Sequence, residues 1–583
     1  MAENTGPRIN RRRALQLGGL ALAVPAVPAL PGLQVAARAA GAGGSEAGEF
    51  RDPGPDWLVE ATVVDLQRMM TSGQLSARRL SELYLARIAA IDSHGPRLNS
   101  IIELNPEAVP IAEQRDEERA QGRVRGPLHG IPVLLKDNID TGDRMQTAAG
   151  SLALVGRPAL RDATVAERLR DAGAVILGKT TLSEWANFRG SHSTSGWSGR
   201  GGQCNNPYAI DLNPCGSSSG SAAATSANLT AVSLGTETDG SIVCPAHLSG
   251  VVGIKPTVGL TSRAGVIPIS HNQDTVGPHA RTVADAAAVL GALTGVDPRD
   301  PATAASAGHF QRDYTQFLDP SGLSGARIGV ATDFVGLQAK SDAVFADNLV
   351  ALQRAGATLI DVTFPHIAQI NAGADEFTVL LFDFKHDLNA YLQTRVGVPI
   401  HSLADAIAFN RAHFEDELLF FGQDIFVSAQ AIDLTDPATV AAYQTALARD
   451  RRFGGAQGID LLLQQNHLDA IVAPTGNPAW PTDLPNGDAF GFGSSSPAAI
   501  AGYPIINVPA GQVFGAPVGI SFMGTAWSEP TLIRLASGFE HVTHARRVPH
   551  FLPDQRFDTP GVPNPPEQHR NPGPAQTAQA RLL

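Results

Sequence analysis

Apolar positions along the chain follow two patterns, which predict two kinds of element. Apolar residues recur at helical spacing in three segments near the start, which predicts helices at 62–91 (with a break at Gly73), 105–121 and 163–172. Short apolar runs bounded by turn residues predict strands at 130–135, 174–178, 328–330, 359–362, 470–473 and 505–508. This alternation of helices with short strands predicts an α/β fold with a mixed β-sheet.

Four further segments complete this picture of the fold. Residues 180–188 are expected to turn helical again, residues 190–202 are Gly/Ser-rich and predict a loop, and residues 221–229 predict a helix of small residues that suits close packing. Residues 367–450 are mostly helical in pattern and carry many aromatic side chains. No Gly/Ser-rich or Pro-rich linker interrupts residues 56–550, so we expect a single large domain there, although length alone would suggest several.

The two ends of the chain differ from the middle. Residues 1–39 contain three consecutive arginines from Arg11, then a proline-interrupted apolar run and an Ala-x-Ala sequence, which is typical of a twin-arginine signal peptide. Residues 40–55 are expected to be a linker, and the Pro-rich residues 551–583 a disordered tail. We therefore expect a secreted or extracytoplasmic protein. A stable membrane anchor is not expected, because the apolar run is short and broken by prolines.

Charge narrows the range of partners. The composition is ordinary for a globular enzyme, with 43% hydrophobic and 17% charged residues, and the formal net charge is -12. Basic residues are concentrated in the first 39 positions, so the remainder of the chain is more acidic still. This balance argues against nucleic acid and anionic membranes as partners. It identifies neither the substrate nor the oligomeric state.

Four strings rich in glycine, serine or small apolar residues carry the candidate chemistry. They are Gly-Ile-Pro-Val-Leu-Leu-Lys-Asp-Asn (130–138), Asn-Pro-Cys-Gly-Ser-Ser-Ser-Gly-Ser-Ala-Ala-Ala (213–224), Leu-Gly-Thr-Glu-Thr-Asp-Gly-Ser-Ile-Val-Cys-Pro-Ala (234–246) and Val-Val-Gly-Ile-Lys-Pro-Thr (251–257). Together these strings resemble the amidase signature family, and the string at 236–245 resembles most the bacterial peptide amidases. The resemblance implies a large mixed sheet covered by helices on both faces, and no metal or organic cofactor.

The same resemblance implies a Ser-cisSer-Lys triad that cleaves amide C–N bonds through an acyl-enzyme. Ser241 is then the nucleophile, Ser217 the bridging serine after a cis peptide bond from Gly216, and Lys136 the base, with Ser218 helping to hold the lysine. A serine hydroxyl needs a nearby base at neutral pH. A lysine can act as that base only when desolvation makes it neutral. Lys136 directly follows a predicted buried strand.

The turn that ends in Ser241 is expected to form the oxyanion hole through the backbone N–H groups of Thr238, Asp239, Gly240 and Ser241, as the resemblance implies. Asp239 stands where many family members have glycine, which puts in doubt any role that needs a glycine backbone conformation there. Val243 stands where relatives often have arginine, so an electrostatic role at that position is absent.

Three cysteines are present, an odd number that excludes complete pairing. Cys215 and Cys244 lie beside the two serine strings, so one disulfide near the site is an alternative. We favour the other interpretation, in which Cys204, Cys215 and Cys244 are buried free thiols that pack as small apolar groups.

Other functions fit parts of the sequence. Residues 216–220 also satisfy G-x-S-x-G, which would make Ser218 the nucleophile of an α/β-hydrolase, but no strand is predicted before it. A metalloamidase is disfavoured, because there is no H-E-x-x-H and the histidines show no ligand spacing. The favoured substrate is a small amide or a C-terminally amidated peptide. Aryl acylamidase activity, ester or carbamate hydrolysis, a non-catalytic binding protein and a tRNA-dependent amidotransferase component remain as alternatives.

Overall fold

The computed structural model describes residues 54–555, which belong to one compact unit. The strands are β1 Ile101–Leu104, β2 Pro132–Lys136, β3 Val175–Thr180, β4 Trp197–Ser198, β5 Gly202–Gln203, β6 Val232–Glu237, β7 Val252–Lys255, β8 Thr275–Ala280, β9 Arg327–Ala331, β10 Thr358–Val362, β11 Ala470–Pro474, β12 Ile505–Val513 and β13 Ala516–Met523. The α-helices are α2 Val63–Thr71, α3 Ala77–Arg87, α4 Ala108–Ala120, α5 Thr164–Asp171, α6 Ser219–Ser226, α7 Val243–Ser249, α8 Val283–Leu293, α9 Ala339–Arg354, α10 Ile367–Ala372, α11 Ala374–Leu392, α12 Leu403–Ala412, α13 Phe414–Glu417, α14 Asp424–Ala431, α15 Pro437–Asp450, α16 Asp460–Asn466, α17 Ser496–Ala501 and α18 Glu529–Thr543.

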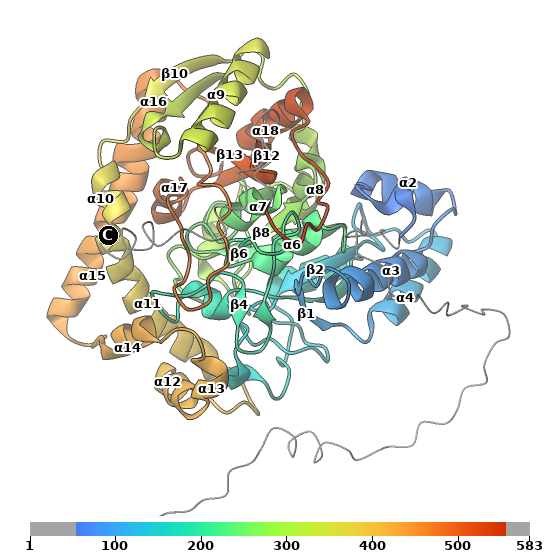
Figure 1. Ribbon diagram of the computed structural model, residues 1–583, viewed down its shortest axis with the longest axis horizontal. Helices are drawn as coiled ribbons and strands as arrows, with labels where there is room; N and C mark the ends of the chain where they lie inside the picture. The colour runs from blue at the N-terminus through green and yellow to red at the C-terminus, as the bar shows by residue number, and fades with distance from the viewer. Residues whose placement is uncertain (1–53, 556–583) are drawn as a thin grey trace, which may run out of the picture. The chain divides into compact units, whose positions relative to one another are not determined.

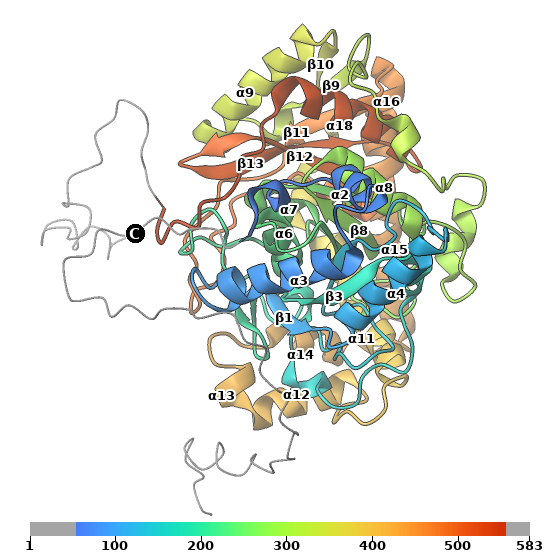
Figure 2. The same cartoon turned by 90° about the vertical axis from the view of Figure 1, so that its right-hand side faces the viewer.

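Eleven strands form one mixed sheet in the order β1-β3-β2-β6-β8-β7-β12-β13-β11-β9-β10. Strand β2 is parallel to both β3 and β6, while β6 and β7 are antiparallel to β8. At the other end of the sheet, β11 and β10 are parallel to β9. The α/β prediction with a mixed sheet is therefore confirmed. Figure 2 shows β12 and β13 in the upper half of the molecule and β1 and β3 in the lower half.

Helices cover both faces of the sheet because successive strand residues point to opposite sides. Val472 of β11 packs in the cluster that includes Leu352 of α9 and Leu535 of α18. Its neighbour Ile471 packs in the cluster that includes Leu462 of α16. A strand buried on both faces reads as a continuous apolar run rather than an alternating one, which explains why 470–473 was predictable.

The segment 180–188 corrects one sequence-based expectation. It does not form an α-helix: β3 extends to Thr180, and only a short 3-10 turn at Glu184–Asn187 follows. Within that turn Trp185 has φ 49° and Ala186 has φ 55°, in the left-handed region. Tertiary contacts fix this path, because the Trp185 N–H donates to the Ala149 carbonyl and Arg189 pairs with the buried Glu184. Such tertiary contacts outweigh the intrinsic preference of these residues for a helix.

The helices α10 to α15 lie together, in yellow and orange, at the left and bottom of Figure 1. Three of them, α11, α12 and α14, contribute to a second apolar cluster that contains Phe384 and Leu388 of α11 with Phe426 of α14. Trp185 joins this cluster and contacts Phe426 edge to face at 5.5 Å between ring centroids. The cluster therefore fastens this helical region onto the segment that follows β3.

The described structure extends five residues beyond the predicted start of the tail. Leu552 bridges Ala209, and the Gln555 N–H donates to Asp211. The rest of the predicted tail, the predicted signal peptide and residues 40–53 of the predicted linker lie outside the described residues. Within 54–555, no helix has the length and apolar character that a membrane crossing needs.

Candidate active site

The four predicted side chains converge where β2 and β6 end. Lys136 is the last residue of β2, Ser217 and Ser218 precede α6, and Ser241 lies between β6 and α7. Because β2 and β6 are neighbouring parallel strands, their carboxyl ends meet at the same edge of the sheet. Sheet topology thus brings together residues that are far apart in the sequence.

Lys136 is fully buried, and its ammonium or amine group has three partners. Nζ lies 2.8 Å from Ser217 Oγ, 2.9 Å from Thr236 Oγ1 and 3.2 Å from the Thr236 carbonyl oxygen. Burial lowers the pKa of Lys136 to about 7, although Asp274 and Glu237 oppose this shift. Desolvation disfavours the cation, so near neutral pH a large fraction of this side chain is an amine that can accept a proton.

Ser217 follows a cis peptide bond from Gly216. Its carbonyl oxygen accepts from the Ser183 N–H at 3.1 Å, and its side chain is fully buried. Ser218 does not contact the lysine directly. Its Oγ donates to the Thr236 carbonyl at 3.0 Å and accepts from the Thr236 N–H at 3.2 Å. Ser218 therefore positions Thr236, the residue that holds Lys136.

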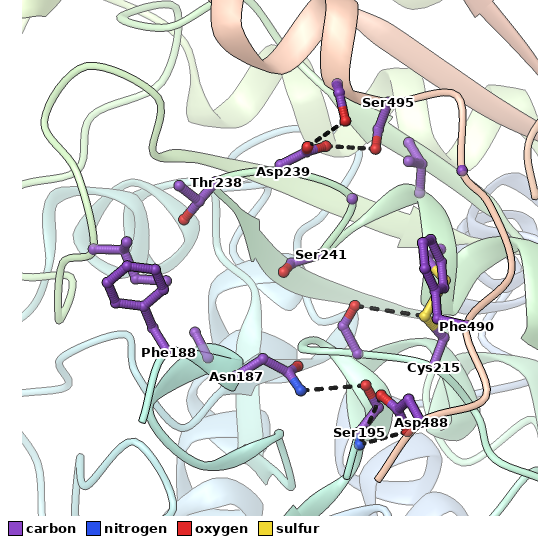
Figure 3. A pocket seen from close by; sticks show the side chains of 18 of the residues that line it. Asn187, Phe188, Ser195, Cys215, Thr238, Asp239, Ser241, Asp488, Phe490 and Ser495 are labelled. Carbon is purple, nitrogen blue, oxygen red and sulfur yellow. Dashed lines mark hydrogen bonds between the residues drawn. A yellow bond between two sulfur atoms is a disulfide. The ribbon is translucent and has the colours of Figure 1, made fainter. Parts of the chain in front are cut away.

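Ser241 is 8% exposed and lies at the centre of the cavity in Figure 3. Its carbonyl oxygen accepts from the Ser218 N–H at 3.2 Å, which joins the two serine turns. Among the hydrogen bonds of the described residues, none links the hydroxyls of Ser217 and Ser241. The left-handed residue of the turn is Gly240, with φ 77°, and Asp239 keeps a negative φ. Aspartate at 239 is thus compatible with the turn, and the glycine requirement falls on position 240.

The backbone N–H groups from Thr238 to Ser241 donate to no acceptor within the described part of the chain. The next two N–H groups, by contrast, both donate to Oε2 of the buried Glu237. The Asp239 carboxylate accepts from Ser495 Oγ at 2.5 Å and from Ser496 Oγ at 2.7 Å. The turn therefore offers unused donors beside Ser241, as an oxyanion site requires.

Cys215 and Cys244 form a disulfide, with Cα atoms 5.9 Å apart. The expectation of three free thiols was therefore wrong for this pair, and Cys204 alone among the described cysteines is free and buried. The reason is spatial: Cys215 precedes the Ser217 turn, Cys244 follows the Ser241 turn, and those turns lie side by side. The covalent link fastens one serine turn to the other.

A cavity of about 320 Å³ opens onto Ser241. Phe188 lines it on one side, and Phe490 with Asp488 on another (Figure 3). Ile269 and Leu380 also line the cavity. Among residues 54–555, the only ionisable groups that line it are the carboxyls of Asp239 and Asp488, and burial raises the pKa of both. Four of these lining residues, Phe188, Ile269, Asp488 and Phe490, were not predicted, because they carry no motif and come from segments outside the serine strings.

The rival nucleophile finds no support in the geometry. Ser218 is fully buried, is engaged with Thr236 and follows an irregular segment rather than a strand. The nearby His247 and His279 hydrogen-bond to the backbone carbonyls of Asn477 and Ile242, and burial lowers the pKa of each to about 4. Neither histidine contacts a serine hydroxyl, so a Ser-His pairing is not formed here.

The fold and this site define an amide hydrolase. Residues 79–533 match the family described as Amidase, and the chain belongs to that family. The native peptide amidase from Stenotrophomonas maltophilia is 53% identical in sequence with a TM-score of 0.80, and the match covers 85% of this chain and 99% of that one. A probable amidase from Arabidopsis thaliana is 45% identical over 501 residues, covering 85% of this chain and 92% of the relative.

The relatives also include components of amidotransferases. One such component, from the glutamyl-tRNA(Gln) amidotransferase of Halorhodospira halophila, is 32% identical, covering 83% of this chain and 97% of the relative. The family membership and the amidase signature fold expected from the sequence strings are confirmed. The protein is an amidase that hydrolyses amide C–N bonds.

Proposed function

We propose that this amidase removes ammonia from C-terminally amidated peptides, with Ser241 as nucleophile, Ser217 as bridge and Lys136 as base. The observation that carries the proposal is the buried contact between Lys136 Nζ and Ser217 Oγ, directly behind a cavity that exposes Ser241. A lysine with a pKa of about 7 is suited to accept and return a proton near neutral pH.

The reaction follows from this geometry. The Ser241 hydroxyl attacks the amide carbon while its proton passes to Ser217 Oγ, whose own proton moves to the neutral amine of Lys136. The oxygen anion forms beside the N–H groups of residues 238–241, which stabilise the tetrahedral intermediate. The C–N bond then breaks, the proton returns through Ser217 to the leaving nitrogen, and ammonia departs. Water hydrolyses the acyl-enzyme by the same relay, and Ser241 is regenerated with release of the carboxylic acid.

Two features favour an amidated peptide as the substrate. The cavity has room and apolar surface for the side chain next to the amide, and within the described part of the chain no lysine or arginine lines it to bind a free carboxylate. The similarity to a peptide amidase points the same way. Aryl amides, esters and carbamates would use the same three residues and are the alternatives that the test must separate.

The test is ammonia release from a small panel. An amidated dipeptide, the same peptide as the free acid, an aryl anilide and a carbamate are each incubated with wild type and Ser241→Ala, and products are identified by mass spectrometry. We expect ammonia from the amidated dipeptide only, and none with Ser241→Ala. Turnover of the anilide or carbamate with the peptide untouched would overturn the substrate, and full activity of Ser241→Ala would overturn the nucleophile.

We also propose that the protein is exported by the twin-arginine route. The arginines at 11–13 and the apolar run after them support this, and so does the disulfide between Cys215 and Cys244, since disulfides persist outside the reducing cytoplasm. Replacing Arg11, Arg12 and Arg13 by lysines should leave the enzyme in the cytoplasmic fraction of a twin-arginine-competent host. An unchanged extracytoplasmic fraction would contradict this route.

A further inference from the structure

Two histidines and two aspartates gather next to the catalytic pocket without a part in the reaction above. His271 lies in the loop before β8, whereas Asp383, His386 and Asp387 occupy one face of α11 at i, i+3 and i+4. One ligand atom from each of His271, His386 and Asp387 lies within 4.8 Å of the others. Across residues 54–555 this is the one group of three or more such side chains that could hold a metal ion.

The Asp387 carboxylate lies between the two imidazoles. Nδ1 of His271 is 2.9 Å from its Oδ2, and Nδ1 of His386 is 2.7 Å from its Oδ1. Asp383 supplies a second carboxylate and is fully buried. Its Oδ2 accepts from Ser270 Oγ at 2.6 Å, but its Oδ1 accepts no hydrogen bond and lies 3.7 Å from Nδ1 of His271. This buried carboxylate oxygen thus faces His271 and lies near the Tyr443 hydroxyl without a well-formed hydrogen bond, and a cation bound there would offset the cost of its burial.

The cluster is accessible, and no lysine or arginine among the described residues forms an ion pair with Asp383 or Asp387, although Arg263 is close enough to act electrostatically on Asp387. It opens onto a surface cavity of about 520 Å³ that His271, His386 and Asp387 help to line. Two guanidinium groups border the same cavity, and Nη1 of Arg263 donates to the His271 backbone carbonyl at 2.7 Å without hydrogen-bonding to either carboxylate. Arg263 pairs with Asp300 at 2.7 Å, and Arg451 donates to the Asn272 side-chain oxygen at 2.7 Å.

We propose that His271, His386, Asp387 and Asp383 form a binding site for a divalent transition ion, with zinc as the chemical type. Imidazole nitrogens and carboxylate oxygens suit zinc, which takes four ligands at about 2.0–2.2 Å. Tetrahedral ligands at that distance are about 3.3 Å apart, so the more distant donor atoms must approach one another, while each imidazole nitrogen must move slightly away from the Asp387 oxygen that it now contacts. Both imidazoles are more than half exposed and can rotate to do this.

A metal at this position would act on the pocket wall rather than on the chemistry. The loop of His271 also carries Ile269, and α11 also carries Leu380, and both of these residues line the catalytic cavity. Asp274 in the same loop accepts from Thr238 Oγ1 at 2.6 Å. Zinc would therefore fasten the loop to α11 and stiffen one side of the cavity.

Equilibrium dialysis of the full chain against micromolar zinc chloride, followed by elemental analysis, tests the site. We expect wild type to retain about one more zinc ion per chain than His271→Ala/His386→Ala. The matched control is His541→Ala/His544→Ala, another pair of neighbouring histidines, with ring centroids 5.9 Å apart and, among the described residues, no third ligand in reach. This control should keep the wild-type zinc content, and Ser241→Ala should keep it too, because the site is separate from the nucleophile.

Two further readouts decide between binding and accidental contact. Zinc should raise the Tm of wild type by several degrees and leave that of His271→Ala/His386→Ala unchanged, since an ion that binds only the folded state stabilises it. Cobalt(II) should give a visible absorption band that Asp387→Asn, a substitution of equal size, abolishes. Equal zinc contents in wild type and the double variant, or retention only at millimolar zinc, would overturn the proposal. If the double variant does not fold, the cobalt band of Asp387→Asn gives the answer: its loss supports the proposed site, and its persistence overturns it.

Discussion

The floor and the wall of the catalytic pocket differ in how they are built. The floor comprises small or charged polar side chains at strand ends and helix starts, namely Lys136, Ser217, Ser218, Thr236 and Ser241. These side chains are almost fully buried, and four of the five interlock through hydrogen bonds. The wall comprises Phe188, Ile269, Leu380, Asp488 and Phe490, which come from loops and from α11. The comparison indicates that the sheet fixes the chemistry, while separate segments determine which substrate fits.

Removing a floor residue should have the largest effect. Lys136→Ala, Ser217→Ala and Ser241→Ala should each lower kcat by about 10⁴-fold or more, and double variants should lose little beyond that, because the residues of the proposed triad would act as a unit. Steady-state kinetics with an amidated dipeptide measures this. Lys340→Ala, on the exposed face of α9, is the control lysine and should behave as wild type. A loss of only a few fold for Lys136→Ala would show that the relay does not run through the lysine.

The pH profile tests the floor without changing a residue. The pKa of Lys136 is lowered to about 7, so the amine is mostly neutral above pH 7 and mostly charged below it. Because only the neutral amine accepts a proton, kcat/KM should fall about tenfold per pH unit below 7, or about 100-fold by pH 5. Wall variants should keep the same midpoint. A flat profile between pH 5 and 8 would place the base elsewhere.

Breaking the disulfide should affect the floor less than removing a triad residue. Cys244→Ala frees the Ser217 turn from the Ser241 turn, and small displacements of reacting groups lower kcat by about ten- to a hundredfold. The free energy of unfolding should fall by about 3.6 kcal/mol for a loop of this length. Chemical denaturation and kinetics measure both effects, with Cys204→Ala, which leaves the disulfide intact, as the control. Unchanged kcat in Cys244→Ala would show that the sheet alone aligns the two turns.

Changing the wall should have the smallest effect and a different signature. Phe490 is half exposed and lines the cavity, so Phe490→Ala should raise KM for amidated peptides about fivefold, which corresponds to about 1 kcal/mol of lost contact. The kcat value should stay near that of wild type. Small amides that do not reach the wall should be turned over as before, and their rates are the internal control. A fall in kcat for small amides would mean that the wall also positions the floor.

Four of the five floor residues could be predicted from the sequence, whereas Thr236 and most of the wall could not. Lys136 follows an apolar run that gave β2, and Ser217 and Ser241 lie in strings that carry the family resemblance. Strand β6 was not predicted, since Val232–Glu237 mixes Val and Leu with Ser, Gly and Thr. Its polar groups are satisfied inside the core, as in the 2.7 Å bond from Ser233 Oγ to the Ser221 carbonyl. Whether such polar residues are buried depends on their hydrogen-bond partners, and the spacing of apolar residues along the chain does not reveal those partners.

The disulfide and most of the wall also could not be predicted from local sequence patterns. Cys215 and Cys244 are separated by 29 positions, and nothing in that spacing shows that their turns are neighbours. Asp488 and Phe490 enter the cavity from a segment with no signature of its own. Proximity that arises from the order of strands in a sheet is a property of the whole chain, and a local pattern does not contain it.

The parallel pairing of β2 with β6 also determines when activity can arise during synthesis. The residues between these strands must emerge and fold before Lys136 can meet the Ser217 and Ser241 turns. Asp488 and Phe490, which line the cavity, are synthesised long after Ser241. Contacts this distant in sequence form slowly. A chain that has not yet been translated through Phe490 therefore contains Lys136, Ser217 and Ser241 but lacks part of the cavity that would hold a substrate.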